Sequence, residues 1–289
     1  MTVLVLGHLV LDEIHAWDGS VYHAAGGITF PLGAFDALAG ADDRILPVFP
    51  YGCDADEVMH ETATRVPRLE LVGCWQVEEG NTRVRLFHES PAQYNTQLVR
   101  SLASIPPDRY ATQLEQARLV YVNFMTGDDI LATDAASLRG DGRTVFIDLH
   151  MIAYRVHPDG RREPAASREW KQWFAAADIL QCNEHEFAAL SGNAEVDPAY
   201  IRALLQEGGA RCFVLTRGER GADILTDDGL AVHIPAAAPS AVVDPTGCGD
   251  AFGATFAWEY ARGTSVYEAA GKAARAAAFV VSLPGSQGI

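Results

Sequence analysis

The chain has 289 residues and 48% of them are hydrophobic, so it can form a substantial core and does not have the composition of a disordered protein. Its 22 basic and 38 acidic residues give a formal net charge of −16, which argues against nonspecific binding to nucleic acid or to an anionic membrane surface. The charge does not exclude a phosphorylated ligand, because a local nest of backbone N–H groups can hold a phosphate in an acidic protein.

The cysteines indicate a reducing compartment. There are five of them, an odd number, and no two form a Cys-x-x-Cys pair, so neither a disulfide framework nor a zinc site is expected. We therefore expect reduced thiols and a cytoplasmic protein. The apolar start of the chain, residues 2–11, lacks a basic leader and a cleavage site, and no apolar stretch reaches membrane-spanning length.

Apolar runs bounded by turn residues predict the strands in the first half of the chain. A strand over 2–6 is followed by a hairpin that turns at Asp18-Gly19 and ends at Gly26-Gly27. Further strands are expected at 45–48, 71–77, 82–88 and 119–125, and helices at 32–39 and 52–66. Two of these strands, joined by a Glu-Glu-Gly-Asn turn, would form a second hairpin, and the stretch 89–107 has too weak a periodicity to assign.

Strands and helices alternate in the second half. Strands are expected at 145–149, 179–182, 211–215, 221–225 and 230–234, and helices at 170–177, 183–190, 251–262 and 265–281. The alternation implies a three-layer α/β domain with a largely parallel sheet, and the absence of a repeat or linker predicts one domain over 1–289. Ligands of such sheets bind beyond the carboxyl ends of the strands, so Asp148 is a candidate for substrate binding. Asn123 is another candidate, unless it is a satisfied buried amide.

The stretch from Val242 to Gly253 carries the chemistry. A strand end, a Gly-rich turn and a helix start follow one another, and the first N–H groups of a helix and its dipole favour an anion. The turn glycines, Gly247 and Gly249, allow a ligand to approach closely. Asp250 would repel a bound phosphate, but it suits the removal of a proton from a hydroxyl that attacks the phosphate. A purely structural turn is the alternative.

Two other phosphate-binding loops are absent from the sequence: Phe252 stands where a dinucleotide fingerprint needs its third glycine, and Gly-Lys-Ser/Thr occurs nowhere. Instead Asp-Pro-Thr-Gly-Cys-Gly-Asp, ending at Asp250, resembles the C-terminal signature of the ribokinase-like carbohydrate kinases, the phosphofructokinase B family. The resemblance implies a ribokinase-like fold and makes Asp250 the catalytic base. It also implies an anion hole of three backbone amides, those of Gly247, Cys248 and Gly249. Pro245 and Cys248 depart from the usual signature, but a hole made of backbone groups need not lose its function.

The resemblance extends to the N-terminal part. In that family an early aspartate, matched here by Asp12, binds sugar hydroxyls, and a carboxylate suits this role because it accepts from two vicinal hydroxyls. A glycine pair, matched by Gly26-Gly27, hinges a small β lid over the substrate. The lid is expected here from inserts at about 12–27 and 71–98. Pro31 stands where relatives often carry asparagine, which puts the substrate in question rather than the fold.

Three residue pairs match family positions for the donor and for metal ions: Asn183 and Glu186 for hydrated magnesium, Thr216 and Gly218 for ATP, and Asp244 and Thr246 for a monovalent cation such as potassium. The magnesium assignment is reasonable because this cation prefers oxygen ligands and keeps most of its water, although an acidic helix start is the alternative. Arg217 or Arg220 could neutralise donor phosphates. The loop over 155–164 holds three arginines that could bind a substrate phosphate or form a solvated surface.

Together these features predict magnesium-dependent transfer of the ATP γ-phosphate to a hydroxymethyl group of a sugar or related small molecule. Two alternatives stay open. One is a nucleoside kinase of the same fold. The other is a non-catalytic sensor of sugars or nucleotides, prompted by Pro31 and by the lack of the asparagine that relatives often carry in the last helix. Open strand edges of the lid would suit a homodimer.

Overall fold

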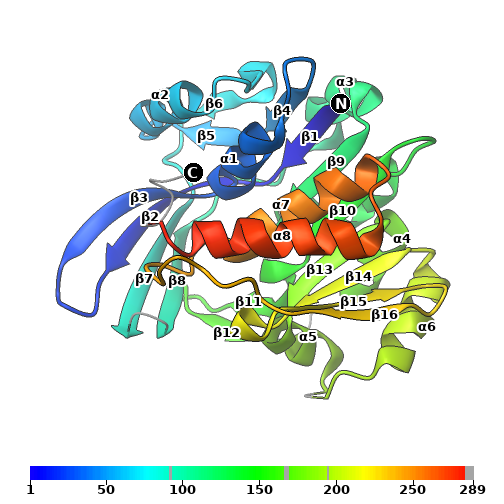
Figure 1. Ribbon diagram of the computed structural model, residues 1–289. Helices are drawn as coiled ribbons and strands as arrows, with labels where there is room; N and C mark the ends of the chain where they lie inside the picture. The colour runs from blue at the N-terminus through cyan, green and yellow to red at the C-terminus, as the bar shows by residue number, and fades with distance from the viewer. Residues whose placement is uncertain (91–92, 166–168, 194, 284–289) are drawn as a thin grey trace.

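The computed structural model describes residues 1–90, 93–165, 169–193 and 195–283. Its centre is an eight-stranded sheet in the order β16-β15-β14-β13-β10-β9-β1-β4 (Figure 1). These strands are β1 (Thr2–Leu6), β4 (Arg44–Val48), β9 (Leu119–Asn123), β10 (Thr144–Asp148), β13 (Ile179–Asn183), β14 (Cys212–Thr216), β15 (Ala222–Thr226) and β16 (Ala231–Ile234). Neighbours from β14 to β4 run parallel, whereas β15 pairs antiparallel with both β14 and β16. This confirms the prediction of a largely parallel sheet.

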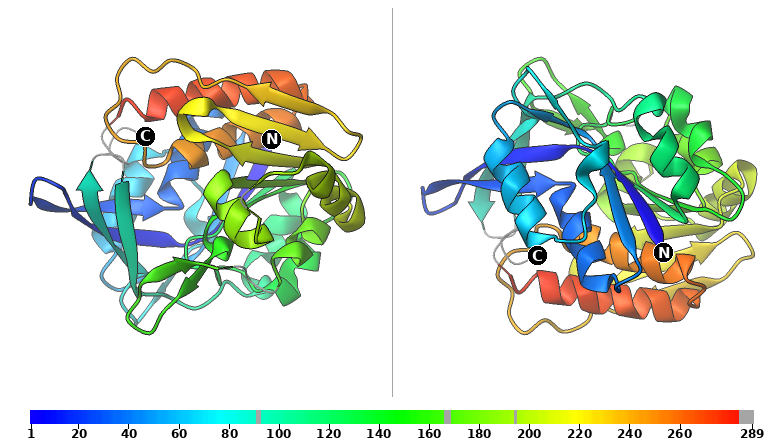
Figure 2. Two further views of the ribbon diagram at one scale, coloured as in Figure 1. Left: turned by 90° about the horizontal axis from the view of Figure 1, so that it is seen from below. Right: turned by 90° about the horizontal axis from the view of Figure 1, so that it is seen from above.

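Helices cover both faces of this sheet (Figures 1 and 2). One face packs against α1 (Thr29–Leu38), α7 (Cys248–Ala261) and α8 (Val266–Val280), and the other against α3 (Pro107–Gln116), α4 (Trp173–Ala176), α5 (Glu184–Ser191) and α6 (Pro198–Gly208). Strands covered on both faces are largely apolar, as in β9, where every residue is buried and only the last, Asn123, is a polar amide. At the centre of the core the ring of Tyr121 stacks on Phe146 at 4.7 Å, and Phe35 of α1 meets Tyr121 edge-on at 5.3 Å.

A second, four-stranded sheet projects from the main sheet (Figure 1). We call it the small sheet. Its strands are β2 (Leu9–His15), β3 (Val21–Gly27), β7 (Arg83–Ser90) and β8 (Gln93–Arg100), in the order β3-β2-β7-β8. The hairpin predicted around Asp18-Gly19 is present, because β2 and β3 pair antiparallel from Leu9 with Gly27 to His15 with Val21.

The prediction for residues 71–98 was partly wrong. The expected strand at 71–77 is a short 3-10 helix, η1 (Leu71–Gly73), followed by β6 (Trp75–Val77), which pairs with β5 (Pro50–Gly52) instead of joining the small sheet. Gly73 lies directly against Pro47 and Val48 of β4, and this contact keeps the segment on the main sheet. The partner of β7 is β8, which comes from the stretch that had no assignment.

The boundaries of two helices also differ from the prediction. The helix expected over 32–39 begins three residues earlier, at Thr29, and the one expected over 52–66 is α2 (Asp56–Arg65). The remaining elements are short: η2 (Ala132–Leu138), η3 (His150–Ala153), η4 (Trp170–Gln172), η5 (Gly218–Arg220) and a hairpin of β11 (Tyr154–Val156) and β12 (Arg162–Pro164). None of the helices in the described ranges has the length and apolarity needed to cross a bilayer.

Candidate active site

Polar side chains gather where three neighbouring strands of the main sheet end. The register places Asn123 of β9 opposite Asp148 of β10, and Asp148 opposite Gln181 of β13. The Asn123 amide donates a 2.7 Å hydrogen bond to Oδ1 of Asp250 in the first turn of α7. The Gln181 amide donates to Oδ2 of Asp148 at 3.2 Å and to the carbonyl of Gly249 at 2.9 Å. The strand ends therefore fix both the aspartate and the glycine turn of the C-terminal motif.

Burial raises the pKa of two carboxyl groups in this cluster. The pKa of Asp250 rises to about 6, held below a higher value by His150 and by the Asn123 hydrogen bond. The pKa of Asp148 rises to about 7, with His150 again opposing the shift. Two neighbouring carboxyls that titrate near neutral pH can exchange a proton with a substrate hydroxyl, as general acid–base chemistry requires.

The start of α7 presents open backbone donors. Gly247 is the N-cap and adopts a left-handed conformation with φ of 81°, and its Cα faces the ring of buried Phe30. Of the three amides expected to form an anion hole, that of Cys248 already donates to the carbonyl of Pro245 at 3.2 Å. The N–H groups of Gly247 and Gly249 have no acceptor within the described part of the chain. This helix start therefore offers two open N–H groups at its positive end.

Asp12 lies on β2, where the small sheet meets the hinge glycines. Gly26 packs so tightly on Oδ2 of Asp12 that a side chain there would overlap the carboxylate. Gly27 has φ of 63° and lies against the carbonyl of His8, so this position also needs glycine. Burial raises the pKa of Asp12 to about 7, and the charge of Arg162 opposes that rise.

The first turn of α1 joins the two halves of the site. Thr29 donates from Oγ1 to the carbonyl of Gly26 at 3.2 Å, and the next residue, Phe30, covers Gly247. Pro31 follows in the same turn and is buried. The glycine hinge beside Asp12 and the turn that carries Asp250 are therefore separated by one apolar helical turn.

Asn183 and Glu186 form a capping box at the start of α5. The Asn183 side chain accepts from the backbone N–H groups of His185 and Glu186, both at 2.9 Å. The Glu186 carboxylate accepts from the Asn183 N–H at 2.8 Å and contacts Nδ1 of His150 at 2.6 Å, and it is 3% exposed. These oxygens are already bonded, and no group of three His, Cys, Asp or Glu side chains arranged for a metal occurs in the described residues. As placed, the pair does not fit a direct magnesium site.

His150 is the positively charged group beside Glu186. Burial acts to lower its pKa, but the charge of Glu186 and the hydrogen bond between them, with smaller effects from Asp148 and Asp250, raise the pKa to about 9. The imidazole is thus the cation that balances Glu186 at neutral pH.

Residues expected on the donor side follow the next strand. Thr216 ends β14 beside Asn183, and Gly218 begins η5 with φ of 56°. Arg217, a candidate for neutralising phosphates, donates to Asp223 at 2.6 Å and to Glu184 at 3.2 Å. Arg220 also pairs with Glu184. The positive charges of this turn are therefore balanced within the protein.

The two residues matched to a monovalent cation lie in the loop before α7. Oδ1 of Asp244 accepts the N–H of Thr246 at 2.8 Å, and the carbonyl of Val281 holds the loop by accepting from Val243 and Asp244. One Asp244 oxygen is thus engaged in a turn. The last part of the chain, 284–289, lies outside the described residues.

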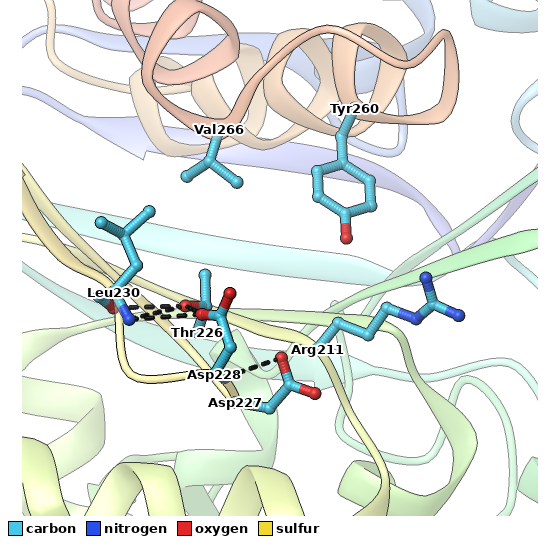
Figure 3. Close-up of a pocket in the computed structure, with 7 residues that line it drawn as sticks. All are labelled: Arg211, Thr226, Asp227, Asp228, Leu230, Tyr260 and Val266. Carbon is cyan, nitrogen blue, oxygen red and sulfur yellow. Dashed lines mark hydrogen bonds between the residues drawn. The ribbon is translucent and has the colours of Figure 1, made fainter.

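A different hollow lies at the opposite end of the main sheet (Figure 3). It is lined by Arg211, Thr226, Asp227, Asp228, Leu230, Tyr260 and Val266. Arg211 directly precedes β14, and Thr226 pairs with Cys212 at the beginning of that strand. The carboxyl end of β14, with Thr216, is at the other edge, so this hollow is separate from the candidate active site.

Three contributors were not recognised as site residues from the sequence: Gln181, His150 and Arg162. Gln181 lies two residues before Asn183 in an apolar strand, and its polar character there was the only available signal. His150 follows Asp148 closely but shows its role only through Glu186, 36 residues away. Arg162 is one of three arginines in a loop for which the sequence offered either a substrate phosphate or a solvated surface.

The comparison with protein families gives a match between residues 156–289 and the model of the pfkB family of carbohydrate kinases. Among curated proteins, the cytidine kinase of Thermococcus kodakarensis is 27% identical over an alignment of 277 residues, and the match covers 93% of this chain and 91% of that protein.

Solved structures agree in fold. A pyrophosphate-dependent kinase in the ribokinase family superposes with a TM-score of 0.81 at 17% identity, covering 99% of this chain and 96% of that one. The ribokinase of Arabidopsis thaliana, solved with ribose and ATP, superposes with a TM-score of 0.76 at 19% identity, with the same coverage of 99% and 96%.

Proposed function

Since the chain belongs to the pfkB family of carbohydrate kinases, we propose that it transfers a terminal phosphoryl group to a hydroxymethyl group of a sugar or nucleoside. The observation that carries this proposal is the placement of Asp250. Its carboxylate is fixed at 2.7 Å by Asn123, has a pKa of about 6, and lies in the same turn as the open N–H groups of Gly247 and Gly249.

The chemistry follows from this arrangement. Asp250 takes the proton of the acceptor hydroxyl while that oxygen attacks the terminal phosphorus, and the bond from phosphorus to the bridging oxygen of the donor breaks. The amides of Gly247 and Gly249 stabilise negative charge on the oxygens of the group in transfer. Asp12 receives hydroxyls of the acceptor, Asn123 holds the base through its hydrogen bond, and the charges of Asp148 and Asp250 act on each other. Closure of the small sheet over the acceptor would exclude water that could otherwise hydrolyse the donor.

The donor we propose is ATP, bound along the edge that carries Thr216 and Gly218. Magnesium would come with ATP, held by its phosphates and water, since Asn183 and Glu186 are engaged with each other and with His150. When bound, the cation would neutralise phosphate charge. Because one structure of the same fold is a pyrophosphate-dependent kinase, inorganic pyrophosphate is the donor to test beside ATP.

A nucleoside is the second candidate acceptor. The similarity to a cytidine kinase over 93% of the chain favours it. A sensor without catalysis would not need a carboxylate fixed beside open amides, so the placement of Asp250 speaks against that alternative.

We expect product formation that depends on the acceptor when the protein is mixed with magnesium-ATP and a panel of sugars, sugar phosphates and nucleosides. The measurement is ADP release, with inorganic pyrophosphate replacing ATP in a parallel series and phosphate release as its readout. Ribose set against cytidine, adenosine and inosine separates the two acceptor classes. Ligand-induced shifts in melting temperature without any product would support the sensor and overturn the kinase.

We also propose that two copies of the chain associate through the small sheet. This sheet and the turn between β2 and β3 carry the exposed apolar side chains Trp17, Val21, Tyr22, Phe87 and Val99. An apolar patch beside a strand edge with unpaired backbone groups favours association with another copy of the chain. Replacement of Trp17, 64% exposed, by Glu should convert a dimer to a monomer in light scattering. Tyr267→Glu, at a side chain 65% exposed on α8, is the control. A wild-type monomer at the same concentration would refute the proposal.

A further inference from the structure

The β11–β12 hairpin is attached to the small sheet. The N–H of Leu98 in β8 donates to the carbonyl of Gly160 at 2.8 Å, and the Gln97 side chain donates to the carbonyl of Asp159 at 2.6 Å. Gly160 has φ of 83°, and a side chain there would overlap the carbonyl of Leu98. The hairpin turn therefore docks closely on the outer edge of β8 (Figure 1).

This docking carries Arg162, the first residue of β12, into the region of the hinge. Its Nη2 donates to the carbonyl of Met125 at 2.8 Å. Met125 itself lies next to Gly27, the second glycine of the hinge. Arg162 is half-buried, unlike its neighbour Arg161, which is exposed and pairs with Asp159 at 2.7 Å. The two adjacent arginines thus occupy different environments.

Arg162 supplies the positive charge that acts on Asp12. Burial raises the pKa of Asp12 to about 7, and Arg162 is the charged group that lowers it. The residues facing Asp12 across the small sheet, Ala24 on β3 and Val84 on β7, are apolar, and Gly26 covers its Oδ2. Without the guanidinium, this half-buried carboxyl group would be left in surroundings that favour its neutral form.

We propose that Arg162 is a positioning residue of the acceptor site, which shifts the Asp12 carboxyl group towards the ionised form that accepts two vicinal hydroxyls. The inference rests on the proposed function and deepens it, because it assigns the recognition of a diol to an aspartate–arginine pair. A neutral carboxyl group would accept less well and would place an O–H donor where the diol also donates.

The proposal predicts a pH-dependent loss of acceptor affinity in Arg162→Gln. Removal of the cation raises the pKa of Asp12, so the ionised form is reached only at higher pH. We expect acceptor Kd, measured by calorimetry with the acceptor that the panel identifies, to weaken about tenfold at pH 7 and to recover towards pH 9. The kcat at saturating acceptor and the affinity for the donor should change by less than about threefold, and Arg162→Lys should restore most of the affinity.

Two comparisons separate this role from a structural one. Arg161→Gln removes the adjacent exposed arginine and should bind acceptor as the wild type does. Gly160→Ala, which displaces the hairpin from β8, should reproduce the acceptor defect of Arg162→Gln while donor affinity stays the same. Equal loss of donor and acceptor affinity in Arg162→Gln, or a loss that does not change with pH, would overturn the proposal.

A measurement without any acceptor distinguishes this inference from the proposed function. The side-chain carboxyl of Asp12 can be titrated by NMR in protein labelled with ¹³C-aspartate, with Asp12→Asn to identify the signal. We expect its pKa to rise in Arg162→Gln and to stay unchanged in Arg161→Gln. If Asp12 responds in this way but no acceptor is phosphorylated, the kinase proposal fails alone; if phosphorylation occurs but Asp12 does not respond, this inference fails alone.

Discussion

Replacement of Asp250 by Asn should lower kcat by about 10²- to 10⁴-fold while donor affinity changes little, because an amide cannot take the proton of the acceptor hydroxyl. The substitution keeps the size of the side chain and leaves an oxygen that can still accept from Asn123, which now donates to Oδ1 at 2.7 Å. The fold of the turn should therefore persist, and the effect should appear in turnover rather than in binding. Single-turnover product formation and donor Kd are the measurements.

The pH dependence of kcat tests the same role independently. A general base works only when it is deprotonated, and burial raises the pKa of Asp250 to about 6. Activity should therefore rise with pH through about 6 and fall as the carboxyl group protonates below it. Asp148, whose pKa lies at about 7, is coupled to it, so the profile reports the pair. Asp227→Asn, in the hollow at the other edge of the sheet, is the control for Asp250→Asn. Wild-type turnover in Asp250→Asn would exclude the role of base.

The elements that the sequence predicted well are those set by a short stretch of chain. The strand that became β10 is centred on a short apolar run, Val145-Phe146-Ile147, and such a run needs no partner to be recognised. The turn that carries Asp250 is also local, since strand end, glycines and helix start lie within a dozen residues. Local patterns of this kind predicted the main sheet and the position of the proposed base.

Long-range pairing was the part that the sequence could not supply. Asn123 was a candidate for substrate binding, and in the structure its side-chain amide donates a hydrogen bond to Asp250, 127 residues later. Gln181 reaches Gly249 across 68 residues, and only the register of β9, β10 and β13 brings these groups together. A polar residue at the end of a strand is easily noticed, but its partner is determined by topology.

The charge partners of the expected magnesium and phosphate residues show the same limit. The carboxylates of Glu184 and Glu186 both have charged protein partners: Arg217 and Arg220 for Glu184, and His150 for Glu186. The sequence alone did not show these partners, because they come from other segments of the chain. Arg162 was ambiguous for a similar reason, because its environment depends on how a hairpin docks on another sheet.

The glycine turn itself gives the second large expected effect, in Gly247→Ala. Gly247 has φ of 81°, a conformation that costs other residues about 1–2 kcal/mol, and an added Cβ would overlap the ring of Phe30. Either the glycine turn that holds Gly247 or the first turn of α1, which carries Phe30, must move. Both border the proposed path of the phosphoryl group. We expect kcat to fall by about 10²- to 10³-fold, the effect of losing one well-placed donor to developing charge.

Gly249→Ala is the matched control, since it changes the other glycine of the same turn. A Cβ at Gly249 meets no atom within 4 Å, and its φ lies outside the strained range, so the backbone can keep its course and its open N–H. Near-normal turnover in Gly249→Ala beside a large loss in Gly247→Ala would indicate that the site depends on backbone geometry rather than on small side chains. That dependence would also explain how a cysteine can stand between them. Equal losses in the two variants would mean that the phosphoryl group passes too close to Gly249 for any side chain. Turnover in Gly247→Ala like that of the wild type would remove this turn from the mechanism.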